Sequence, residues 1–183
     1  MKNTMTTFTG RHFDPMQIRT EDICIEDIAH ALSLMCRGGG HLKYFYSVAQ
    51  HSLNCSAEAK ARGWSGKLQL ACLLHDASEA YISDIIRPVK ANLTGYLEIE
   101  SRIMEKILEK FNLSDLTEEE RRMWKQIDDE MLYYELKNLM SGEEDLAAPE
   151  LCALPDISER NWQSVETDFL RAAHTLISVK WRA

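Results

Sequence analysis

Hydrophobic residues recur every three or four positions along most of the chain, which is the spacing of one face of an α-helix. Six segments follow this pattern, and polar or glycine-containing stretches separate them. Residues 1–22 and 143–163 break it with glycines, prolines and polar clusters, and are expected to be irregular. The six segments run approximately from Ile23 to Gly38, from Ser47 to Gly63, from Ser65 to Pro88, from Leu97 to Phe111, from Thr117 to Gly142, and from Ser164 to Leu176.

Helix-capping residues support these boundaries. Ser47 and Ser65 are candidate N-caps, and Thr117 with Glu120 has the spacing of a capping box. We find no convincing strand alternation, so the pattern predicts an all-α protein of about six or seven helices. At 183 residues we expect one domain over 1–183, with an irregular start (1–22), a core (23–140) and a C-terminal loop and helix (143–183).

Composition fits a globular chain and narrows its partners. Hydrophobic residues make up 45% and charged residues 27%, and the formal net charge is −8. An acidic surface is repelled by a phosphate polymer, so we expect no nucleic-acid strand as the main partner. A single nucleotide remains possible, because one phosphate needs only one cation or metal ion.

Cysteine usage favours the cytoplasm. The five cysteines include no CxxC pair, and the odd count suits reduced thiols better than a disulfide framework. The N-terminus has no apolar region of a signal peptide, and no apolar run approaches the length of a membrane span. We therefore expect a soluble, cytoplasmic protein with no membrane partner.

The stretch of residues 73–81, LLHDASEAY, carries the most informative chemistry. His75 and Asp76 follow an apolar run, and Glu79 lies close enough along a helix to share one side with them. Two acids and an imidazole in a small space favour a bound cation. The alternative is a hydrogen-bonded core histidine with both acids in solvent.

Two further residues fit the same chemistry. His51 lies in the middle of a predicted helix among apolar residues, and Asp128 borders the apolar face of another. Each has a plain alternative, a satisfied core histidine and an exposed acid. Together with the His75–Asp76 pair they supply two nitrogens and two oxygens, a mixture that suits Zn, Mn, Co or Fe.

The order H…HD…D, with HDASE after an apolar helix, resembles the HD-domain metal-dependent phosphohydrolases. FYSVAQHS, LLHDASEAYISDIIRPVK and the later KQID are similar to the small HD 5′-deoxynucleotidases of the YfbR and YfdR type, as are GRHFDP and DIAHALSLMCRGGGH near the start. Position by position, the resemblance implies metal ligands at His51, His75, Asp76 and Asp128, an acid handling the catalytic water or its proton at Glu79, an acid near the sugar and that water at Asp84, and a phosphate-binding arginine at Arg37.

Further positions have weaker parallels. The residue after the arginine is often aromatic in the family, where it helps exclude a ribose 2′-hydroxyl, but here it is Gly38, which leaves sugar selectivity open. His41 stands in the family's Gly-His position and is expected to contact substrate, or else to be an exposed loop residue. Lys90 is a candidate phosphate contact or a solvated charge. Without the resemblance, Arg37 reads as a helix-terminal cation and Asp84 as a turn acid.

Together with these residues, the resemblance implies a metal-dependent phosphohydrolase that removes phosphate from (deoxy)nucleoside 5′-monophosphates with one divalent ion, Mn, Co, Zn, Fe or Mg. The partner is a small nucleotide, and the resemblance is compatible with a homodimer. One alternative is hydrolysis of a deoxynucleoside triphosphate to deoxynucleoside and tripolyphosphate. An alternative of another class is a non-catalytic, metal-stabilised nucleotide-binding or scaffold protein.

Overall fold

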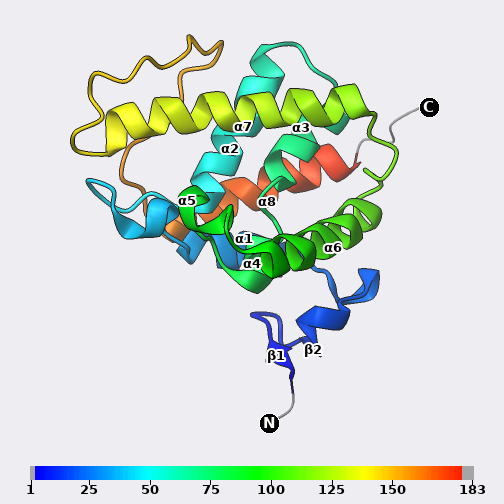
Figure 1. The fold of residues 1–183 in the computed structure, drawn as a ribbon. Coiled ribbons are helices and arrows are strands. Elements are labelled where there is room, and N and C mark those ends of the chain that lie inside the picture. The colour runs from blue at the N-terminus through cyan, green and yellow to red at the C-terminus, as the bar shows by residue number, and fades with distance from the viewer. Residues whose placement is uncertain (1–2, 179–183) are drawn as a thin grey trace.

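A computed structural model describes residues 3–178; residues 1–2 and 179–183 of the predicted terminal segments lie outside the described range. The fold is all-α, as the hydrophobic pattern predicts, with six helices of nine or more residues and two single-turn helices in the described range (Figure 1). The helices are α1 (Ile25–Leu34), α2 (Val48–Ala61), α3 (Gly66–Leu74), α4 (Glu79–Ile82), α5 (Arg87–Lys90), α6 (Thr94–Lys110), α7 (Glu118–Leu139) and α8 (Trp162–Ser178).

The predicted caps begin three of these helices. The Ser47 hydroxyl accepts from the backbone N–H of Gln50, and Ser65 caps α3 in the same way. Thr117 and Glu120 form the capping box of α7, each side chain bonding the other residue's backbone N–H. These bonds satisfy N–H groups that a helix start leaves without partners.

One predicted helix is wrong. We expected a continuous helix from Ser65 to before Pro88, but α3 ends at Leu74 and residues 75–78 form a turn before α4. In the turn, hydrogen bonds join residues three apart, such as the Glu79 N–H to the Asp76 carbonyl (3.0 Å). Ser83, with φ 72°, then ends α4 and redirects the chain toward α5.

The sequence pattern also missed short elements. A two-stranded antiparallel sheet joins β1 (Met5–Thr6) to β2 (His12–Phe13) near the N-terminus. Three short 3₁₀ helices follow, η1 (Pro15–Gln17), η2 (Thr20–Asp22) and η3 (Arg37–Gly40). In Figure 1 the β1–β2 hairpin projects from the helical body.

Helix α2 is central to the packing. It contacts α1, α3, α7 and α8, and Figure 1 shows α7 on one side of the molecule and α6 on the other. The main core includes the buried residues Ile28, Leu73, Ile107 and Phe169. A smaller cluster lies between α2, α3 and α7 and includes Cys55, Cys72 and Ile127.

One face of α2 is polar and yet buried, because it binds the backbone of the α7–α8 connection. Gln50, Asn54 and Glu58 are spaced four residues apart and form hydrogen bonds with residues 152–158. We call residues 151–158 the strap. The two Glu58 carboxylate oxygens accept from the strap's Cys152 and Ala153 N–H groups (3.0 and 2.7 Å). The predicted irregular segment therefore has a fixed course without regular structure.

All five cysteines are free, and Cys55 and Cys72 are buried. Within residues 3–178 we find no helix with the length and apolar character that crossing a membrane requires.

Candidate metal centre and adjoining pocket

Four polar side chains from three parts of the fold meet at one point. His51 comes from α2, His75 and Asp76 from the turn after α3, and Asp128 from α7. The two Nε2 atoms are 3.1 Å apart, and His75 Nε2 lies 3.2 Å from Asp76 Oδ2. Asp128 Oδ1 lies 3.5 and 3.6 Å from the Nε2 atoms of His51 and His75. The residues predicted as ligands thus lie together.

Hydrogen bonds on the far side of each ring leave both Nε2 atoms as acceptors. The backbone carbonyl of Cys72 can only accept, so His75 Nδ1 must donate to it (2.8 Å). The carboxylate of Glu135 accepts from His51 Nδ1 (2.7 Å). In the neutral imidazoles, two lone pairs and two carboxylates therefore converge where a cation would satisfy them all.

The spacing also suits a metal ion. Ligands about 2.1 Å from an ion in tetrahedral or octahedral geometry lie roughly 3.0–3.4 Å from one another, and the distances here run from 3.1 to 3.8 Å. The local field already favours positive charge: burial opposes it, but Asp76 and Asp128 raise the pKa of His75 well above its ordinary value.

A second group at the same point includes a thiol. His51, Cys55 and His75 each bring a ligand atom within 4.8 Å of the others, so this part of the structure could hold a metal ion. Cys55 Sγ lies 3.5 Å from His51 Nε2 and 4.0 Å from Nδ1, so it sits beside the ring and not in line with the Nε2 lone pair. Burial, with Asp128 and Glu135 nearby, raises the pKa of the Cys55 thiol well above its ordinary value, which opposes the thiolate form.

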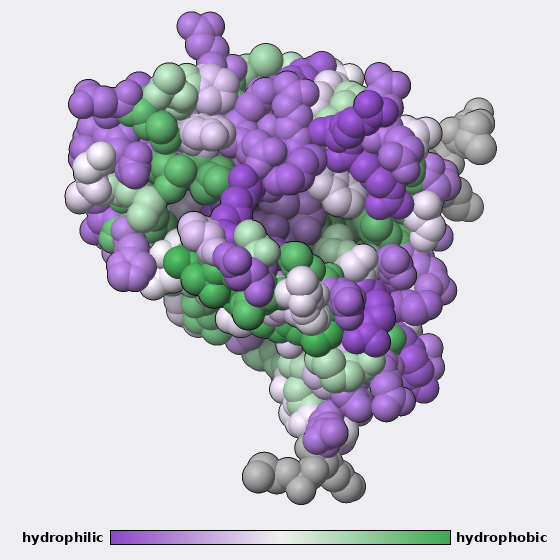
Figure 2. All heavy atoms as spheres, in the orientation of Figure 1, coloured by the Kyte–Doolittle hydropathy of each residue, from purple (hydrophilic) through white to green (hydrophobic). Residues whose placement is uncertain are grey.

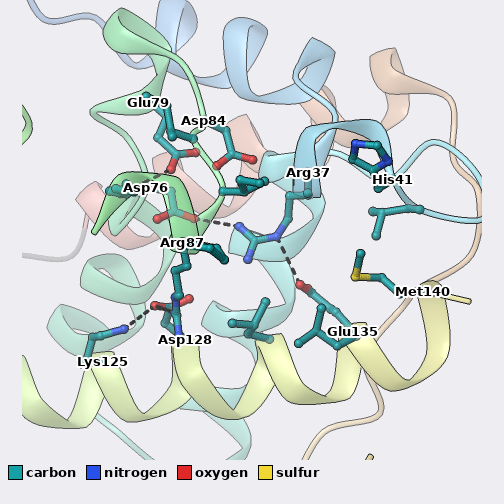
Figure 3. Close-up of a pocket in the computed structure, with 18 residues that line it drawn as sticks. Arg37, His41, Asp76, Glu79, Asp84, Arg87, Lys125, Asp128, Glu135 and Met140 are labelled. Atoms are coloured by element: carbon teal, nitrogen blue, oxygen red, sulfur yellow. Dashed lines mark hydrogen bonds and ion pairs between the residues drawn. The ribbon is translucent and has the colours of Figure 1, made fainter. Parts of the chain in front are cut away.

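A pocket of about 620 Å³, a volume in the range of small-molecule sites, adjoins this cluster and is lined by two of its four residues, Asp76 and Asp128. Figure 2 shows a hollow in this face of the molecule, bordered by hydrophilic side chains on one side and hydrophobic ones on another. The pocket's polar lining includes Arg37, Asp76, Glu79, Asp84, Asp128 and Glu135 (Figure 3), and its aliphatic lining is Leu42, Ile85, Ile86, Pro88, Leu132, Leu136 and Met140.

Arg37 points into this pocket from the first residue of η3 (Figure 3). Its guanidinium donates to Asp76 Oδ2 (3.1 Å), and its Nε lies 3.2 Å from Glu135 Oε2. Only 12% of the side chain is exposed. Burial opposes the charge, but these two acids raise the pKa of Arg37 above its ordinary value, so the guanidinium stays cationic.

Glu79 and Asp84 lie on another wall of the pocket. Among the described residues, the buried Glu79 Oε2 has no hydrogen-bond partner. Burial, together with Asp76 and Asp84, raises the pKa of Glu79 to about 10, and burial also raises the pKa of Asp84. Lys90 lies 4.0 Å from Glu79 Oε1 and forms an ion pair with Glu100, so its charge already faces acids.

Consecutive glycines bend the chain beside Arg37. Gly38, Gly39 and Gly40 have φ of 61°, 62° and 80°, a region that other residues rarely adopt. The bend brings both Gly38 and His41 to the pocket lining, with His41 largely exposed. All ten residues predicted for the site therefore lie in the ligand cluster or along the pocket.

Sequence reasoning missed three residues of this region. Glu135 lies seven residues after Asp128 on α7, and this spacing is the only signal that it shares that face. Arg87 donates to Asp128 Oδ2 (2.8 Å), and Lys125 lies 3.0 Å from the same atom. Neither cation has a signal in the sequence that separates it from other surface charges.

Comparison with known proteins gives relatives without assigned activity. The chain is 44% identical over 107 residues to a protein of Escherichia coli K12 named only as uncharacterized protein YfdR, and the match covers 58% of this chain and 57% of that protein. It is 41% identical over 111 residues to an uncharacterized protein of Rhodobacter capsulatus, covering 57% and 56%. The chain thus spans little more than half the length of the curated relatives it matches. No protein-family profile matches it.

Proposed function

We propose that this protein is a metal-dependent phosphohydrolase of the HD-domain type that removes phosphate from (deoxy)nucleoside 5′-monophosphates. One observation carries the proposal: two histidines and two carboxylates converge beside a pocket that also holds a buried arginine and a buried acid. A purely structural metal site needs neither Arg37 nor Glu79. The resemblance of the H…HD…D motifs supports the same class.

His51, His75, Asp76 and Asp128 are the proposed ligands of one divalent ion. The mixture of nitrogen and oxygen suits Mn, Co, Zn or Fe. Mg is a further alternative, although it prefers oxygen ligands. Cys55 is left out because its sulfur lies beside the His51 ring and burial favours the protonated thiol. When bound, the ion would lower the pKa of a water and polarise a phosphoryl oxygen.

The chain's own groups account for substrate binding. Arg37 donates one N–H group to Asp76 and forms an ion pair with Glu135, and its other N–H groups can bind a phosphate in the pocket. That contact offsets charge on the phosphoryl oxygens, which is most of what phosphoryl transfer needs from a protein. The aliphatic lining contacts the sugar and base and excludes water.

Glu79 is suited to proton transfer. With a pKa of about 10 it holds a proton at neutral pH in the metal-free protein, and its unpartnered Oε2 is free to exchange that proton with a pocket water or a leaving oxygen. Asp84 is also partly buried and has a raised pKa, and it can form hydrogen bonds with the sugar and the water at the same wall of the pocket.

A second candidate is hydrolysis of a deoxynucleoside triphosphate to tripolyphosphate. The observation that favours it is a pair of cations in the pocket lining, Arg87 and Lys125. Both side chains are about half exposed and could contact a longer phosphate chain. These cations already pair with Asp128 and Asp129, so the monophosphate remains our first choice.

The test is a product screen of dAMP, AMP and dATP with Mn²⁺, Co²⁺, Zn²⁺ or Mg²⁺, with products identified by mass. Asp129→Ala is the matched control for Asp128→Ala, because both acids bind Arg87 and Lys125 but only Asp128 contacts the histidines. We expect phosphate from dAMP, loss of activity in Asp128→Ala and retention in Asp129→Ala. Tripolyphosphate from dATP alone would favour the second candidate. Metal binding without any product would refute the enzyme assignment.

A further inference from the structure

Glu135 occupies a buried position between two parts of the proposed site. It lies on α7, almost two helical turns after Asp128, with only 4% of its surface exposed. One side faces the ring of His51, and the other faces the guanidinium of Arg37. Figure 3 shows its carboxylate directed at Arg37.

Three groups contact its two carboxylate oxygens, two by hydrogen bonds and one as an ion pair. Oε1 accepts from His51 Nδ1 and from the Tyr46 hydroxyl, both at 2.7 Å. Oε2 lies 3.2 Å from Arg37 Nε. Among side chains, only a carboxylate can accept from both donors here while also balancing the charge of a buried arginine.

Tyr46 is itself held in place by the strap. Its fully buried hydroxyl accepts from Asn54 Nδ2 (2.9 Å), and the same Asn54 amide group also donates to the Asp156 carbonyl (3.0 Å). Asn54 Oδ1 accepts the Asp156 N–H (3.0 Å). A continuous chain of hydrogen bonds therefore runs from the strap to Glu135.

From these contacts we infer that Glu135 is a positioning residue that acts on two groups at once: it fixes His51 with Nδ1 as donor and Nε2 free for the metal, and it aims Arg37 at the phosphate. The inference deepens the proposed function and rests on it. Glu135 couples metal affinity to phosphate affinity, although it binds neither the metal nor the substrate in this assignment.

Glutamine at this position tests the idea at constant shape. Its single carbonyl cannot serve His51, Tyr46 and Arg37 together, and its amide must point an N–H at one of these donors. Glu130→Gln is the matched control, because Glu130 lies on the same helix and its carboxylate is bound by Arg62 and Gln126 and not by His51, Tyr46 or Arg37.

Three measurements on the purified full chain separate the possible results. They are the Zn²⁺ dissociation constant by chelator competition, the binding of inorganic phosphate to the Mn²⁺-loaded protein by calorimetry, and the melting temperature. For Glu135→Gln we expect metal affinity to fall about 10- to 100-fold and phosphate binding to weaken as well. Glu130→Gln should leave both affinities within about twofold while lowering the melting temperature.

The inference is overturned if Glu135→Gln changes only the melting temperature, as a merely structural acid would. If that variant does not fold, Tyr46→Phe replaces it, since it removes one hydrogen bond and keeps the carboxylate. The metal affinity of Tyr46→Phe should then lie between that of the wild type and that expected for Glu135→Gln. A metal affinity equal to that of the wild type would overturn the inference. Neither binding measurement depends on turnover, so a wild type that binds zinc and phosphate but hydrolyses nothing would refute the proposed function alone.

Discussion

Replacing Glu79 by glutamine should stabilise the metal-free protein at neutral pH. Burial raises the pKa of Glu79 from its ordinary value of 4.5 to about 10, so the folded state must hold a proton that the unfolded state releases above pH 4.5. At 1.36 kcal/mol for each pH unit above 4.5, this costs about 3 kcal/mol at pH 7 and under about 1 kcal/mol at pH 5. Glutamine carries no ionisable proton and removes the cost.

The sign follows from proton binding. Between pH 4.5 and about 10 the folded protein binds more protons than the unfolded chain at this site, so wild-type stability falls as the pH rises. Urea unfolding of chelator-treated protein, followed by circular dichroism at pH 5 and pH 7, measures the difference. Glu119→Gln, an exposed acid on α7, controls for the loss of an acidic residue.

The stabilisation by Glu79→Gln should grow by about 2 kcal/mol or more between pH 5 and pH 7. The effect of Glu119→Gln on the free energy of unfolding should be the same at both pH values. A variant no more stable than wild type at pH 7, or one whose difference does not change with pH, would refute the reasoning. The same variant should lose roughly 10²- to 10⁴-fold in phosphate release if Glu79 transfers a proton. Stability and activity are thus expected to move in opposite directions.

Other substitutions probe separate parts of the site. His75→Ala should purify with almost no bound metal, and full occupancy by elemental analysis would remove it from the ligand set. Arg37→Ala should lower kcat/KM about 10²- to 10³-fold in phosphate-release kinetics while metal content stays close to wild type; unchanged kinetics would take it out of the phosphate site. Glu58→Ala leaves two strap N–H groups without acceptors and should cost about 2–4 kcal/mol in urea unfolding with metal affinity unchanged. Gly38→Ala should cost about 1–2 kcal/mol because its φ is 61°, with Gly38→Asn costing less; equal losses would point to a clash and not to the backbone.

The sequence was enough to predict the helical class and the main capping residues. Ser47, Ser65 and the Thr117–Glu120 pair act over three or four residues, so their geometry is contained in the local sequence. The break after Leu74 was not predictable in this way. Residues 75–82 contain no glycine or proline, and the turn reflects tertiary contacts of His75 and Asp76 with other helices.

The same contrast holds for the site. His51, His75, Asp76 and Asp128 were predicted from residue type and motif order, and the structure brings them together. Glu135 was missed because it is one of seven acidic residues in α7, and only its position across from His51 and Arg37 distinguishes it. A contact between residues 84 positions apart leaves no trace in local spacing.

The strap has a consequence for the order in which the chain folds. Asn54 and Glu58 bond partners 102 and 95 residues further along, so these contacts of the polar face of α2 cannot form until the chain beyond α7 has been made. Contacts of such sequence separation are slow to form, because a long loop must close before they contribute. During synthesis α2 can therefore pack its apolar face early, while its polar face stays hydrated. Completion of the strap is then a late step, and it withdraws the polar side of this helix from water.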